Sequence, residues 1–120
     1  MLGRLFKSWK IQKAREVSYE DSKEYAASDS HVERKALAKR TDVKPEVLYF
    51  LAEDKSATVR RKVAKNPSTP RQADLILAKD SVGELRCDLA LKIGRLVPNI
   101  SEIENERLLA MTFQVLELLA

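Results

Sequence analysis

The sequence has few of the residues from which disulfide scaffolds, zinc sites and β-sandwiches are built. It contains one cysteine, Cys87, and one histidine, His31, so an internal disulfide framework and a multi-cysteine zinc site are excluded. Glycine and proline are scarce, and β-branched and aromatic residues are too few for a β-sandwich. No apolar run reaches the roughly 18 residues that span a bilayer, and the first residues do not resemble a secretory signal. We therefore expect a helical protein of a reducing compartment such as the cytoplasm.

The side chains that usually carry catalysis are also scarce. The sequence has no glycine-rich phosphate loop, and its single histidine cannot plausibly serve a Ser–His–Asp triad. Cys87 has no histidine near it in the sequence, and its register predicts an outward-facing helix position. His31 has no Cys, Asp or Glu at a metal-ligand spacing, so we expect it to be a surface or capping residue. The sequence thus predicts no enzyme activity, no metal and no cofactor.

The middle of the chain contains the same pattern twice. Asp54 precedes Arg60 as Asp80 precedes Arg86, and the two copies are 26 residues apart. One further step back leads to Arg34, with the same apolar neighbours. A fixed period of this length is typical of stacked helical pairs, each of which buries its apolar face against a neighbour. The spacing predicts helices over about 19–27, 31–40, 45–53, 57–65, 70–79, 82–97 and 102–120.

The same period predicts the domain organisation and the core. We expect a basic N-terminal arm over 1–17 and a repeat domain over 18–120, with repeats over about 18–40, 41–65 and 66–97 and the start of a further repeat over 101–120. The predicted core consists of Leu37, Leu48, Leu51, Val59, Val63, Ile76, Leu77, Leu85, Leu89 and Ile93. The aromatic residues of the repeat domain also fall chiefly at core registers: Tyr19, Tyr25, Tyr49, Phe50 and Phe113.

The pattern D-x4-V-R-x2-V-A that begins at Asp54 resembles the HEAT-repeat consensus. The turn Asn66-Pro67-x-Thr69-Pro70 resembles the leucine-rich-repeat-variant branch, and ALAKRTDVKPEVLYFLAED and RQADLILAKD are similar to segments of a bacterial family of HEAT-like proteins of unknown function. The resemblance covers about 18–120. It implies an all-α, right-handed α-solenoid of HEAT-like helical pairs, and it lends no catalytic residues. It also implies a structural ladder along the stack, formed here by Arg34, Asp54, Arg60, Asp80 and Arg86.

Positive charge in the repeat domain is concentrated between residues 55 and 73, which contain six bases and no acid. We call this segment the basic zone. Its candidate interaction patch consists of Arg61, Lys62, Lys65 and Arg71, which could face an acidic protein or phosphate groups. No aromatic side chain is interleaved with these bases, as stacking on nucleobases would require. A solvated charged face without a partner is the simpler alternative.

The N-terminal arm carries the rest of the excess charge, with five bases and one acid in residues 1–16. Apolar and basic side chains alternate in it at helical spacing: Leu2, Arg4, Phe6, Lys7, Trp9 and Lys10. A short basic amphipathic helix of this kind can lie on an anionic membrane surface or in the groove of a partner. A frayed terminus, or a helix that caps the repeat stack, is the alternative.

The last helix has an apolar face broader than a capping helix should show. The sequence Leu118-Leu119-Ala120 stands where earlier repeats turn into a covering helix, so we expect Leu116 and Leu119 to be exposed. Either the chain is the first piece of a longer repeat protein, or residues 102–120 pack against their copy in a homodimer.

Taken together, these patterns predict a non-enzymatic protein-binding scaffold whose repeat surface recognises a protein partner. One alternative is a nucleic-acid-binding module that uses the basic zone and the arm. A second alternative is peripheral docking to a membrane surface through the arm.

Overall fold

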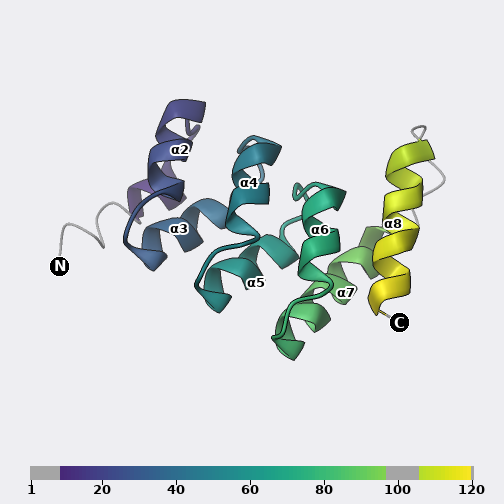
Figure 1. Ribbon diagram of the computed structural model, residues 1–120. Coiled ribbons are helices and arrows are strands. Elements are labelled where there is room, and N and C mark those ends of the chain that lie inside the picture. The colour runs from purple at the N-terminus through teal and green to yellow at the C-terminus, as the bar shows by residue number, and fades with distance from the viewer. Residues whose placement is uncertain (1–8, 97–105, 120) are drawn as a thin grey trace.

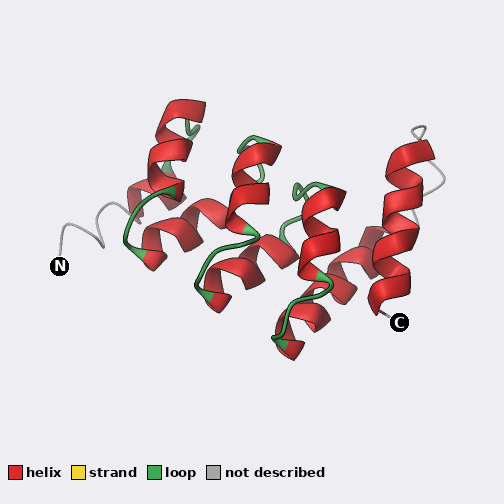
Figure 2. Ribbon diagram, in the orientation of Figure 1, coloured by secondary structure: helices red, strands yellow, loops and turns green. Residues whose placement is uncertain are grey.

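The computed structural model describes residues 9–96 and 106–119, and within these ranges every regular element is a helix. The elements are α2 (Tyr19–Ala26), α3 (His31–Ala38), α4 (Pro45–Leu51), α5 (Ala57–Lys65), α6 (Arg71–Leu77), α7 (Gly83–Leu96) and α8 (Glu106–Leu119), and residues 9–13 are also helical. Figure 2 shows only helices joined by loops in the described part. The all-α class is confirmed, and the helix limits agree with the predicted ranges to within a few residues.

The helices lie in two rows (Figure 1). In the first row α2 packs on α4, α4 on α6, and α6 on α8; in the second row α3 packs on α5, and α5 on α7. The molecule is elongated along the rows, with extents of 45 × 29 × 19 Å. Between the rows lies the apolar core, so each helix has one face on the core and one face available to solvent.

The predicted core is buried with one exception, Ile76, which is only partly buried. On α6 the buried stripe is formed by Ala73 and Leu77, four residues apart, and by Asp74 beside them. Ile76 is adjacent to Leu77 in sequence and so points about 100° away around the helix. It therefore lies at the edge of the stripe and not in its centre.

The aromatic residues do not follow the prediction from their registers. Tyr19, Tyr49, Phe50 and Phe113 are exposed, and only Tyr25 packs partly against the core. On α4 the core face is occupied by the other apolar side chains of the helix, Val47, Leu48 and Leu51. These three already fill the positions i, i+1 and i+4 of one face, so Tyr49 and Phe50 must point elsewhere.

The predicted ladder residues form hydrogen bonds that repeat along the stack. Arg34 donates from Nε and Nη2 to Asp54, at 2.8 and 3.3 Å, and Arg60 donates in the same way to Asp80, at 2.8 and 3.4 Å. Each arginine also donates from Nη1 to a turn carbonyl of its own repeat: Arg34 to Ser28, Arg60 to Asp54, and Arg86 to Asp80. The arginines thus join one turn to the next.

Asp80 is held as a carboxylate in this ladder. Burial alone would raise its pKa, but hydrogen bonds from Arg60 and the Val82 amide, together with the charges of Arg60 and Arg86, outweigh burial and lower it. The folded state therefore binds its proton less tightly than the unfolded chain. The resulting stabilisation is fully present above the unfolded pKa of about 3.9 and is lost as pH falls through the lower folded pKa.

We expect Asp80→Asn to lower the free energy of unfolding by about 1–3 kcal/mol at pH 7, because the charged acceptor of Arg60 is lost. We also expect the variant to lose less stability than the wild type between pH 4 and pH 2.5. Urea unfolding over this range measures both effects. Asp29→Asn is the control, because Asp29 is exposed and forms no ion pair within the described residues. Parallel pH profiles for Asp80→Asn and the wild type would contradict the ladder's contribution.

A second series of hydrogen bonds has the same 26-residue step. Arg40 donates to the carbonyl of Ala14 at 2.8 Å, Asn66 donates to that of Arg40 at 2.8 Å, and Lys92 donates to that of Asn66 at 3.3 Å. The donors are three different residue types, which is why the sequence period did not reveal them. Arg40 also donates to the carbonyl of Ile11, whose side chain is buried. Residues 11–14 of the arm are therefore attached to the stack.

Helix α8 packs on α6 and α7. Val115 is fully buried there, and Leu116 and Leu119 are partly buried against the core. The expectation that Leu116 and Leu119 are exposed is thus wrong, because α8 turns this face inward onto the preceding helices. Phe113 and Leu118 remain exposed on the other side. A homodimer through 102–120 stays a prediction.

Candidate functional site

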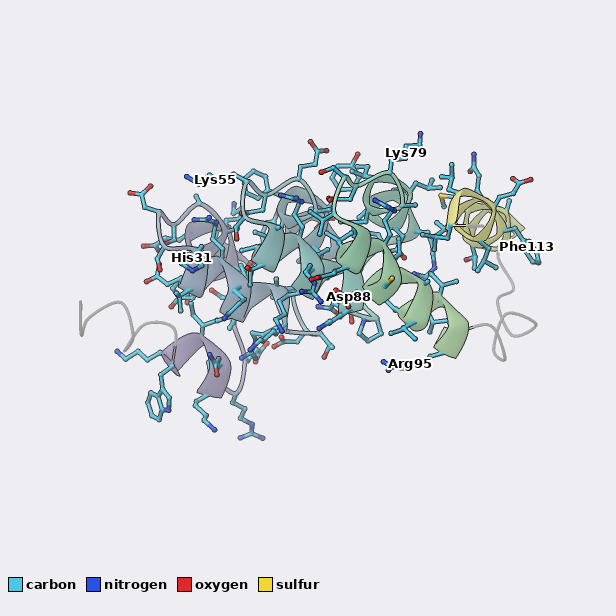
Figure 3. All side chains as sticks on the ribbon, turned by 90° about the horizontal axis from the view of Figure 1, so that it is seen from below. His31, Lys55, Lys79, Asp88, Arg95 and Phe113 are labelled. Carbon is cyan, nitrogen blue, oxygen red and sulfur yellow. The ribbon has the colours of Figure 1, made fainter. Side chains whose placement is uncertain are left out.

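The basic zone is largely neutralised by carboxylates from helices that follow it in the chain. Arg61 donates to Asp88 at 2.7 Å and also pairs with Glu84, and Lys65 lies 3.9 Å from Asp88. Figure 3 shows Asp88 on α7, the helix that packs beside α5. A sequence window over 55–73 cannot reveal these partners, because they lie more than 20 residues away. The candidate patch carries less unpaired charge than its composition suggests.

The two remaining cations of the patch have different surroundings. Arg71 forms an ion pair with Asp74 on the same helix. Lys62 has no carboxylate within ion-pair distance among the described residues. Its pKa is lowered, first by burial and then by the neighbouring cations, which include Lys39 and Lys35 of α3. The patch is therefore reduced to a small lysine cluster between α3 and α5.

The arm residues fall partly within the structure. Leu2, Arg4, Phe6 and Lys7 lie outside the described residues. Trp9 and Lys10 are exposed and border a hollow of about 440 Å³ between the arm and α2. The helical residues 9–13 are thus attached through Ile11 while Trp9 faces outward.

A feature that the sequence analysis missed lies on the solvent side of α4. Phe50 is 60% exposed and Tyr49 is 42% exposed, which is high for large apolar side chains. Three adjoining hollows of about 560, 310 and 330 Å³ surround them. Glu46 borders all three, Phe50 borders the first two, and Tyr49 borders the first and third. We call this surface, from α2 across α4 to the start of α6, the α4 groove.

The charge of the α4 groove is mainly negative. Asp29, Glu46 and Glu53 line its largest hollow, and none of them forms an ion pair within the described ranges. Arg34 and Asp54 also line this hollow, but they neutralise each other with side chains that are nearly buried. The groove therefore combines exposed aromatic rings with unpaired carboxylates.

Two cations also border the α4 groove. Lys23 pairs with Glu20 at 3.2 Å, and its ammonium lies 4.7 Å from the centre of the Tyr19 ring. Lys55 lines the largest hollow and has no ion-pair partner in the described part of the chain. One unpaired cation therefore stands against three unpaired carboxylates.

The residues with catalytic or metal-binding potential are not gathered at one place. His31 and Cys87 are exposed on α3 and α7 respectively. In the described ranges, no group of three or more His, Cys, Asp or Glu side chains could hold a metal ion. Among the same residues, no helix has the length and apolar character needed to cross a lipid bilayer.

The α4 groove could have been anticipated from one signal in the sequence. Tyr49 and Phe50 lie between Leu48 and Leu51, so one helical stripe cannot accommodate all four side chains. Assigning whole clusters to the core from their register concealed this conflict. Comparisons of the chain with protein-family models, with curated proteins and with solved structures found no match.

Proposed function

We propose that the chain is a right-handed α-solenoid of HEAT-like helical pairs and that it acts as a non-enzymatic protein-binding scaffold. The two rows of helices and the two hydrogen-bond series, both with a 26-residue step, support the repeat architecture. Repeat stacks of this kind present extended surfaces on which partners bind.

The exposed aromatic pair of the α4 groove is the observation that carries this proposal. Large aromatic side chains are favoured at the centres of protein interfaces, because they bury a large apolar area at a small cost in conformational entropy. Tyr49 and Phe50 stand on a short helix that packs against α2, α3, α5 and α6. A partner would thus meet rings that the surrounding helices already hold in place.

The alternatives have weaker support. Nucleic-acid binding through the basic zone would have to compete with the ion pairs that Arg61, Lys65 and Arg71 already form. Membrane docking through the arm rests mainly on residues outside the described part. The lysine cluster around Lys62 remains a second contact surface for an acidic partner, and the charge reversal Lys62→Glu would test it.

We expect Phe50→Ala to remove the proteins that the wild-type chain retains from a lysate of its source cells. Truncating an aromatic residue at the centre of an interface costs about 2–4 kcal/mol, which weakens binding by a factor of about 30 or more. The matched control is Phe113→Ala, which removes an exposed phenylalanine from α8. Retention of one and the same protein set by the wild type and both variants would refute the α4 groove as the binding surface.

A further inference from the structure

We propose that the α4 groove selects a protein segment that carries an arginine next to an apolar residue. This proposal rests on the protein-binding function and adds the chemical class of the partner. It follows from the combination of unpaired carboxylates and exposed rings at one place, which neither an acidic nor a purely apolar segment would use fully.

The carboxylates fix the sign of the partner's charge. Glu46 borders all three hollows, so a segment lying anywhere in the groove passes close to it. Asp29 and Glu53 line the largest hollow beside it. Since the three have no ion-pair partner among the described residues, they remain available to a cation from outside. An acidic segment would be repelled.

The cations already present do not reverse this preference. Arg34 is held by two hydrogen bonds to Asp54 and a third to the Ser28 carbonyl. Lys23 is occupied by Glu20 and by the Tyr19 ring at the far side of the groove. Only Lys55 remains, so the groove keeps a negative charge.

The aromatic rings favour arginine over lysine. A guanidinium group is planar and weakly hydrated, so it can stack on an aromatic face while its N–H groups donate to a carboxylate in the same plane. Phe50 and Glu46 border the same two hollows, and Tyr49 and Glu46 also share two. Lys23 over the ring of Tyr19 shows that a cation and an aromatic ring already associate on this face.

An apolar residue beside the arginine is expected for a separate reason. The second hollow is lined mainly by Ala26, Ala27, Val47 and Phe50. A side chain of the partner that enters it removes apolar surface from water, which contributes about 25 cal/mol per Å². The arginine would then provide the charge preference and the neighbouring residue much of the affinity.

A random peptide library displayed on phage, selected on the immobilised full chain, tests this inference. We expect the enriched peptides to carry a net positive charge with an arginine beside an apolar residue. Labelled synthetic copies are then titrated by fluorescence anisotropy. We expect Glu46→Lys to weaken binding at least about tenfold, because it reverses the charge that borders every hollow. Glu117→Lys on α8, an equal charge change at an exposed site outside the groove, should leave the affinity within about twofold.

Replacement of the peptide's arginine by lysine should weaken binding several-fold, and replacement by glutamate should abolish it. Enriched peptides that are neutral or acidic, or an affinity unchanged by Glu46→Lys, would overturn the arginine preference while leaving the scaffold function in place. Absence of any enrichment over the bare support would overturn the scaffold function as well. Self-association that is lost in Phe50→Ala would identify a second copy of the chain as the occupant and would also overturn the proposal.

Discussion

Replacing Asp74 with leucine should lower the free energy of unfolding by about 3–5 kcal/mol. Asp74 is fully buried, and its carboxylate accepts a hydrogen bond from Lys92 Nζ at 2.6 Å and pairs with Arg71 at the edge of the core. The Lys92 side chain is itself only 4% exposed. Without Asp74 its ammonium keeps only the carbonyl of Asn66 as a partner, so an uncompensated charge remains in the core.

The double variant Asp74→Leu/Lys92→Met should recover this loss. Burial raises the pKa of Asp74 and lowers that of Lys92, in each case against the attraction between the two groups. Each charge therefore costs more to bury than its partner returns. An apolar pair of similar volume should thus be as stable as the wild type, or more stable by about 1–4 kcal/mol. The register supports the exchange, because Leu48 occupies the equivalent buried position 26 residues earlier.

Guanidinium unfolding of the wild type, the single variant and the double variant measures both expectations. If the single variant is too unstable to purify, the double variant still decides the question. A double variant that is as unstable as Asp74→Leu alone would show that the ion pair and not the loss of one partner holds this part of the core.

The helices and most of the core could be predicted because they depend on local spacing. A buried leucine or valine every three or four residues indicates a helix face, and the 26-residue period repeats that face. Ile76 was misplaced because a one-residue shift on a seven-residue helix moves a side chain from the centre of the stripe to its edge. Asp74 was not predicted to be buried, because nothing near it in the sequence reveals that Lys92 lies opposite.

The candidate site was less predictable, because it depends on which residues meet from different repeats. The bases of the basic zone were counted as available charge, but Asp88 lies on the next helix of the same row and pairs with two of them. The α4 groove requires two facts that the sequence does not state: that Phe50 points away from the core and that hollows lie on both sides of it.

Leu51→Ala should lower the free energy of unfolding by about 2–5 kcal/mol, because Leu51 is fully buried on a helix that packs against four others. Neighbours held from both rows have little freedom to move into the cavity that the missing atoms leave, so the cost should fall in the upper part of this range. Leu91→Ala on α7 is the matched control; Leu91 is 62% exposed, and the same truncation there should change stability by no more than about 0.5 kcal/mol. Urea unfolding of both variants against the wild type gives the difference. If the two variants unfold at the same urea concentration, Leu51 does not lie in the core and the 26-residue register is wrong.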